Sequence, residues 1–188
     1  MTPEETTKNK EFCDLLRRPF PLKDIQWKPC SMGERQGGAP WVQVLAYLNA
    51  RALENFLDAT FGVMGWSDEY TVYPQGIICK LSVLHDGTWI SKSNGAPETD
   101  IEAFKGGCSS ALKRVCASGY GITRYLYYLG NTYAPIAQKE RPSGTAKELE
   151  AKGWTKSYYK KDKYNKGGYD VWWNTPVMPA WAQPKAVV

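Results

Sequence analysis

The sequence holds few of the residues from which common catalytic and metal sites are built. His85 is the only histidine, so catalytic triads and sites with several histidine ligands have only that residue to use. The five cysteines are scattered, with no CxxC pair to bind zinc or exchange thiols. No GxxxxGKS/T phosphate-binding loop occurs, which argues against an ATP-driven motor. We therefore expect no catalytic residue, no bound metal and no cofactor.

Long apolar runs are also missing. No run approaches the roughly 18 to 20 residues that a membrane span needs. The start MTPEE lacks the basic and apolar regions of a secretory signal. With 188 residues, the chain has room for one domain and a tail. We expect a soluble intracellular protein with no membrane partner.

The net charge of +5 is unevenly spread. Residues 139–170 carry nine basic against five acidic residues, which is nearly all of the excess. Aromatic residues are interleaved with these cations: Trp154, Tyr158, Tyr159, Tyr164 and Tyr169. Such a stretch can follow a phosphate backbone while offering rings for bases to stack on. It equally fits a solvated lysine-rich tail whose aromatic residues pack locally.

Hydrophobic periodicity predicts an α+β fold. Residues 4–18 predict a short helix, and residues 25–28 and 41–48 predict strands. A helix is expected between Asn49, a candidate N-cap, and Gly62. Strand candidates at 66–73, 77–84 and 88–93 are separated by turns at 75–76 and 86–87, so we predict an antiparallel β-meander.

The most regular pattern lies between residues 99 and 118. Its apolar stripe consists of Ile101, Phe104, Cys108, Ala111, Leu112 and Val115. This predicts an amphipathic helix laid on the meander. Gly106 and Gly107 each cost a helix about 1 kcal/mol relative to alanine, and close backbone packing would compensate. A second helical piece is expected at residues 122–129.

These elements suggest three parts of the chain. Residues 1–24 form an N-terminal helical segment, and residues 25–130 form the core domain. Residues 131–188 form a basic C-terminal arm, rich in aromatic residues and proline, which we expect to be extended or partly disordered.

Three blocks of sequence resemble a known family. The run ETDIEAFKGGCSSALKRVCASGYGITRYLYYL resembles the signature helix of the Rad52 superfamily of single-strand annealing proteins, especially its phage Sak and bacterial DdrA-like branch. The block WKPCSMGERQGGAPWVQVLAYLNARALENFLDATFGVMGW is similar to that branch's opening strands and first helix. The meander lies where the family has its central strands. The resemblance covers roughly residues 25–129, and the ending WWNTPVMPAWAQP is a weaker match.

The resemblance implies a β-β-β-α annealing domain that assembles into rings and holds single-stranded DNA in a basic groove. It implies a non-enzymatic protein that pairs complementary strands in ATP-independent homologous recombination and double-strand break repair. The positions that match the family's DNA-binding residues are Arg51, Lys105, Lys113 and Arg114. Many relatives carry another cation near Ala117, where this sequence does not, and Arg124 is the candidate substitute.

The resemblance also implies partners and a location. The partners are single-stranded DNA and further copies of the chain in a homo-oligomeric ring. A host or phage single-strand binding protein or exonuclease is a further candidate. The expected location is the cytoplasm of a bacterial cell, or of the host if a phage encodes the chain.

Other interpretations of these residues stay open. Lys113 and Arg114 also fit an ordinary solvated helix face, and Arg51 also fits a surface pair with Glu54. A general single-strand nucleic-acid-binding module would share the salt-sensitive binding without accelerating pairing. A metal-dependent nuclease would need carboxylates around magnesium, and the candidates form no nuclease motif: Asp68, Glu69, Asp86, Asp100 and Glu102.

Overall fold

The computed structural model describes residues 2–97, 103–160 and 167–185. The chain divides into two compact units, each assembled from separate stretches of sequence. Unit 1 comprises residues 1–25, 48–128 and 182–188, and unit 2 comprises residues 26–47 and 129–181. No helix in the described part is long and apolar enough to cross a membrane. The observed α+β architecture with antiparallel sheets confirms the predicted fold class.

The sheet of unit 1 is a three-stranded meander of β3 (Trp66–Tyr73), β4 (Gly76–His85) and β5 (Thr88–Ala96). His85 pairs with Thr88, so Asp86 and Gly87 form a two-residue turn. Their φ angles of 48° and 73° are positive, as a type I′ hairpin requires. The meander predicted from the sequence is confirmed, with β5 extending to Ala96.

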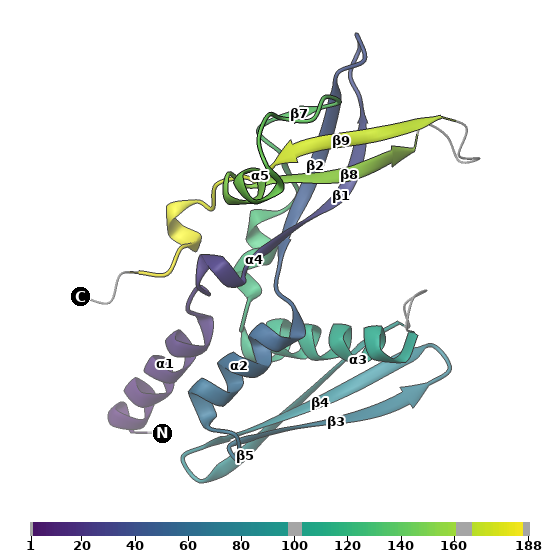
Figure 1. Cartoon of the computed structure of the whole chain (residues 1–188). Coiled ribbons are helices and arrows are strands. Elements are labelled where there is room, and N and C mark those ends of the chain that lie inside the picture. Colours follow the sequence, from purple (N-terminus) through teal and green to yellow (C-terminus); the bar gives the residue numbers. More distant parts are fainter. Residues whose placement is uncertain (1, 98–102, 161–166, 186–188) are drawn as a thin grey trace. The chain divides into compact units, whose positions relative to one another are not determined.

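Helix α3 (Ala103–Arg114) lies across one face of this meander and contacts β4 and β5 (Figure 1). The buried apolar side chains of β4 alternate along the strand: Ile77, Cys79, Leu81 and Val83. Gly107 permits the close approach, because a Cβ atom there would lie 2.7 Å from Ile77 Cδ1. The close packing expected to compensate for the helix glycines is therefore confirmed at Gly107.

The predicted apolar stripe is not buried along its whole length. Phe104 is 60% exposed, whereas Ala111 and Leu112 further along α3 are buried. Gly107 already packs on Ile77, near the first residue of β4, so the helical turn before Gly107 extends past the end of the sheet. Ile101 lies outside the described residues.

The remaining helices of unit 1 follow local sequence signals. Helix α2 (Ala50–Phe61) starts at Asn49, whose side chain accepts a hydrogen bond from the Ala52 N–H, and ends at Gly62, as predicted. It packs against α3. Helix α1 (Pro3–Arg17) is preceded by a capping box and followed by the short η1 (Leu22–Asp24).

After Arg114 the helical backbone does not continue as a regular α-helix. Residues of η2 (Val115–Tyr120) form a π-helix, which ends at Gly121 with a φ of 83°. Helix α4 (Arg124–Leu129) then follows. The sequence predicted one α-helix as far as residue 118. In the structure, the part of this stretch after Arg114 is a π-helix, whose turns are wider.

Unit 2 consists of two small sheets packed face to face. One contains β1 (Gln26–Glu34), β2 (Pro40–Tyr47) and β6 (Thr132–Tyr133), and the other contains β7 (Ala137–Gln138), β9 (Gly168–Asn174) and β8 (Trp154–Lys160). Their shared core is formed by Val42, Val44, Val171 and Trp173. Helix α5 (Ala146–Ala151) precedes β8, and the short η3 (Ala180–Ala182) follows β9.

An extended or partly disordered arm is expected beyond residue 131, but the structure contains α5 and the β8–β9 hairpin there instead. Alternation explains the hairpin, since Val171 and Trp173 face the core while Asp170 is exposed. The lysine- and tyrosine-rich composition conceals this pattern. The functional division into segment, core and arm stays a prediction.

Candidate nucleic-acid interface

The predicted cations of α3 lie on accessible surface. Lys113 and Arg114 end the helix, and Lys105 lies eight residues before Lys113 on the same helical face. Lys105 and Arg114 are exposed, and Lys113 is partly exposed. The helix therefore presents three positive charges at which a polyanion could bind.

Hydrogen bonds from the side chain and to the backbone of Arg114 link it to β5. Its Nη1 donates to the carbonyl oxygen of Gly95 at 3.3 Å. The Asn94 amide donates to the Ser118 hydroxyl, which in turn donates to the backbone oxygen of Arg114 at 2.6 Å. A guanidinium has further N–H groups. Arg114 is thus held in place while retaining donors for another acceptor.

A cation that the sequence analysis missed lies at the other end of η2. Lys92 of β5 donates from Nζ to the Gly119 carbonyl at 2.8 Å, and its ammonium lies 5.5 Å from the Tyr120 ring centroid. Lys92 pairs with Leu81 across the sheet, and paired residues share a face. Leu81 is one of the buried residues of β4 that face α3. The pairing of the two strands could therefore have predicted that Lys92 lies on the same face.

Arg124 binds backbone carbonyls of η2. Its Nε donates to Ala117 at 2.9 Å and its Nη2 to Ser118 at 2.7 Å. These bonds satisfy carbonyl groups at the end of the π-helix, where no helical partner follows. Arg124 therefore supports η2 close to Ala117. Its role in binding DNA stays a prediction.

Arg51 occupies the second residue of α2 and is exposed. A cation in the first helical turn opposes the helix dipole by about 0.3–1 kcal/mol, so helix stability does not explain it. Among the residues that the structure describes, Arg51 makes no ion pair, with Glu54 or any other side chain. The surface pair considered from the sequence is therefore absent, and the positive charge is accessible.

The aromatic residues of α4 differ in exposure. Tyr127 and Tyr128 are 67% and 75% exposed. The Tyr125 hydroxyl instead accepts a hydrogen bond from the Phe20 N–H at 3.0 Å. The expectation that at least one of these tyrosines faces outward is confirmed.

The carboxylates proposed for a nuclease do not gather in the described part of the chain. Asp68 accepts a hydrogen bond from the Tyr70 hydroxyl at 2.7 Å, whereas Glu69 pairs with Lys80 on the opposite face of β3. No three histidine, cysteine, aspartate or glutamate side chains among these residues converge on a common point. Asp100 and Glu102 lie outside the described residues. His85 stacks on Phe12 at 3.9 Å between ring centroids, a packing role.

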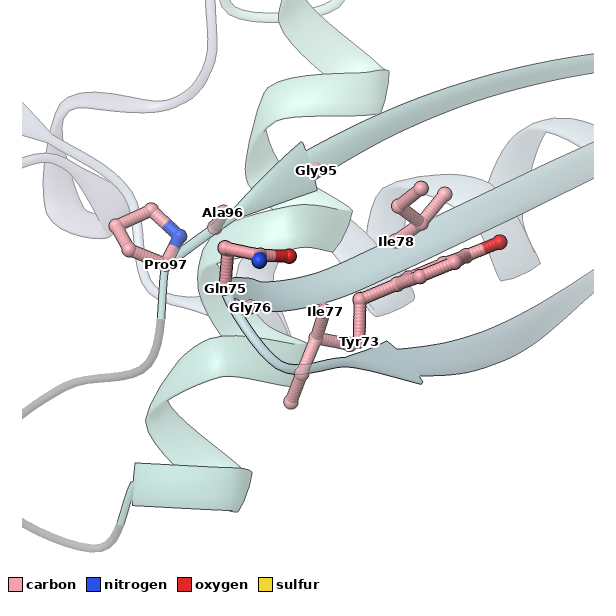
Figure 2. A pocket seen from close by; sticks show the side chains of 8 residues that line it. All are labelled: Tyr73, Gln75, Gly76, Ile77, Ile78, Gly95, Ala96 and Pro97. Atoms are coloured by element: carbon pink, nitrogen blue, oxygen red, sulfur yellow. The ribbon is translucent and has the colours of Figure 1, made fainter.

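A shallow pocket lies where the β3–β4 turn meets the end of β5 (Figure 2). Its lining consists of Tyr73, Gln75, Gly76, Ile77, Ile78, Gly95, Ala96 and Pro97. None of these residues carries a carboxylate, imidazole, thiol or amine. The pocket therefore lacks the paired acid and base groups on which most hydrolytic chemistry depends.

Two buried thiols of unit 1, on β4 and η2, are held protonated. Burial, with a smaller effect of the nearby Asp68 carboxylate, raises the pKa of Cys79 to about 12. Burial likewise raises the pKa of Cys116 well above its ordinary value. A thiol is nucleophilic as the thiolate. These cysteines therefore act as small apolar core residues at neutral pH.

The family can be assigned once this geometry is known. A model of the Rad52/22 family of double-strand break repair proteins matches residues 8–143, more than two thirds of the chain. The chain belongs to the Rad52/22 family. Membership places it among DNA repair and recombination proteins and confirms the resemblance to the Rad52 superfamily. No curated protein sequence matches the chain.

The Rad52/22 match includes every predicted DNA-binding residue, from Arg51 to Arg124. It ends at residue 143, before α5, β8 and β9. The β8–β9 hairpin is thus a feature of this chain outside the part that the family match covers. Placement in the Sak and DdrA-like branch stays a prediction.

Proposed function

We propose that this Rad52/22 family chain is a single-strand annealing protein. It binds single-stranded DNA and pairs complementary strands in ATP-independent homologous recombination and double-strand break repair. The observation that carries this proposal is the family match over a helix that ends in the partly exposed Lys113 and the exposed Arg114. Strand annealing requires no catalytic residue.

The chemistry of annealing fits fixed cations. A protein that speeds pairing must hold phosphates, leave the base edges free and release the duplex. Lysine provides a point charge, whereas the planar guanidinium of arginine can bind phosphate with two hydrogen bonds. Base stacking supplies about 1.4 kcal/mol per base step, so pairing needs no ATP.

Each predicted residue has a defined part in this proposal. Arg51, Lys105, Lys113 and Arg114 neutralise phosphates. Lys92 and Arg124 hold η2 through its carbonyls and so support the helix end that carries Arg114. Arg124 adds positive charge near Ala117.

The proposal includes a homo-oligomeric ring. Tyr127 and Tyr128 supply exposed aromatic surface of the kind that subunit contacts bury. A ring repeats the same cations along one strand, so weak individual contacts give strong total binding. A single-strand binding protein or an exonuclease of the host or phage would supply the strand.

The decisive experiment measures annealing of two complementary fluorescent oligonucleotides without ATP or magnesium. Wild-type protein is compared with Lys113→Glu/Arg114→Glu and with the control Lys8→Glu/Lys23→Glu, which makes the same charge change at exposed residues of α1 and η1. Light scattering checks that all three have the same oligomeric state. We expect rapid annealing by wild type and control, and its loss in the α3 variant.

Two results would contradict the proposal. Wild-type protein that binds strands without accelerating their pairing would be a general single-strand binding module. Full annealing by the oligomeric Lys113→Glu/Arg114→Glu variant would reject the assignment of the site to the end of α3.

A further inference from the structure

Unit 2 carries the net positive charge of the chain. Its two stretches contain eleven lysine and arginine residues against six aspartate and glutamate residues. The remaining thirteen basic residues of unit 1 are balanced by thirteen acidic ones. The affinity of a protein for a polyanion such as DNA increases with the number of phosphates that its cations neutralise. Unit 2 therefore carries an excess of positive charge that is separate from the cations of α3.

The β7-β9-β8 sheet has two different faces. Val171 and Trp173 are buried against β2. The opposite face of the β8–β9 hairpin carries Lys156 paired with Trp172, and Tyr158 paired with Asp170. Tyr158 is 51% exposed, and both Lys156 and Asp170 are exposed. The two aromatic residues thus share a solvent-facing surface with a cation.

Trp172 of this face is partly exposed, and two cations lie near its ring. The guanidinium carbon of Arg141 is 5.7 Å from the Trp172 ring centroid, and Lys156 Nζ is 6.0 Å from it. Arg141 is held there because it also donates to the Gly144 carbonyl at 2.9 Å. Asp170 neutralises part of the charge by pairing with Lys156 at 3.0 Å.

We propose that this face is a second binding site for single-stranded DNA, on which Trp172 and Tyr158 stack bases while Arg141 and Lys156 hold phosphates. Outward aromatic rings on a sheet, flanked by cations, are a common platform for unpaired bases. Double-stranded DNA, whose bases are already stacked, gains nothing from such rings. This inference rests on the proposed function, because that function identifies single-stranded DNA as the ligand.

The second site has a distinct place in annealing. The α3 cations bind phosphates whatever the bases do, whereas a stacking platform binds only bases that are still unpaired. Pairing removes bases from Trp172 and weakens this site alone. The platform would therefore hold an incoming strand and release it as the duplex forms.

The test measures the affinity of the full chain for a labelled oligothymidylate and for an abasic oligomer of equal length and charge. Trp172→Leu removes the ring, and Trp181→Leu is the control because Trp181 is an exposed tryptophan outside the hairpin. Tyr158→Ser and Arg141→Gln/Lys156→Gln change exposed side chains without touching the core. Circular dichroism and light scattering check fold and assembly.

We expect Trp172→Leu to weaken oligothymidylate binding by roughly 5- to 100-fold, since stacking on one ring contributes that much, and to leave abasic binding unchanged. Tyr158→Ser should act in the same direction. The double Gln variant should weaken both ligands and reduce the salt dependence. Trp181→Leu should bind as wild type.

Other outcomes separate this inference from the proposed function. Loss of binding in Lys113→Glu/Arg114→Glu with no effect of Trp172→Leu or Tyr158→Ser would overturn the second site and leave the first. A change of oligomeric state in Trp172→Leu, with oligothymidylate affinity unchanged, would assign the face to a subunit contact and overturn it too. Absence of wild-type binding would remove both proposals.

Discussion

The hydroxyl of Tyr120 donates a hydrogen bond to the backbone carbonyl of Leu81 at 2.7 Å. The same hydroxyl lies 2.8 Å from the carbonyl oxygen of Ile90. The last residue of η2 is thereby tied to β4 and β5 at once. Since η2 begins directly after Arg114, this contact helps to fix the helix end that carries the proposed DNA-binding pair.

Replacing Tyr120 by Phe removes this donor from two carbonyl oxygens. We expect Tyr120→Phe to lower the free energy of unfolding by about 1–3 kcal/mol, measured by urea titration. DNA affinity should fall less than in an Arg114 variant, because no charge is lost. Unchanged stability would show that the carbonyls do not depend on Tyr120.

Stability should decline in alkaline solution. Burial raises the pKa of Cys79 from 9.0 to about 12 and that of Tyr120 from 10.0 to about 12. A raised folded-state pKa gives stability that is complete below the unfolded pKa and is lost as pH rises towards the folded value. Urea unfolding from about pH 8 to about pH 11 should show this decline. Cys79→Ala should make the decline shallower, and an unaltered slope would argue against burial as its cause.

Gly107 is expected to resist replacement by alanine. The new methyl group would meet the buried Ile77 at a cost of about 1–3 kcal/mol, which over most of this range exceeds the gain of about 1 kcal/mol in helix propensity. Thermal unfolding should show a lower melting temperature for Gly107→Ala. In an Ile77→Val background, which lacks the Cδ1 atom, the same change should cost less. An equal cost in both backgrounds would exclude this contact as the reason.

Arg51 should contribute charge but not stability. For Arg51→Gln we expect weaker DNA binding and a plot of log affinity against log salt that is shallower by about 0.7–0.9. The free energy of unfolding should stay the same or rise slightly, because the cation opposes the dipole of α2. Lys8→Gln on α1 is the matched control. A salt dependence equal to wild type would remove Arg51 from the site.

Two variants separate the structural and electrostatic parts of Arg124. Arg124→Gln and Arg124→Lys both lose the paired bonds to Ala117 and Ser118, and each should lower the free energy of unfolding by about 1–2 kcal/mol. Only Arg124→Lys keeps the charge and should retain DNA affinity. If both variants bind DNA like wild type, Arg124 stabilises η2 and does not contribute to DNA binding.

Local chemistry made much of unit 1 predictable. Asn49 and Gly62 mark the ends of α2, and the turn at Asp86 and Gly87 sets the register of the meander. These features depend on neighbours in sequence. The sequence likewise predicted Lys113 and Arg114 on a helix, but within a helix reaching residue 118 and not at the end of α3.

Features that depend on distant residues were missed. The π-helical η2 is stabilised by Asn94 and Lys92 of β5, more than twenty residues earlier. The β8–β9 hairpin buries Val171 and Trp173 against a strand at the other end of the sequence, and its solvent-facing side hides the alternation. Neither partner is visible from a local pattern.

The discontinuous make-up of unit 2 constrains how the protein is made. Strands β1 and β2 leave the ribosome before residues 48–128, whereas β9, which covers Val42 and Val44, comes almost at the end of the chain. At about 5–20 residues per second, the apolar face of the β1–β2 hairpin stays uncovered for several seconds until β9 has been synthesised. The nascent chain therefore offers chaperones a defined early target, and a polypeptide truncated before β9 leaves that face permanently uncovered.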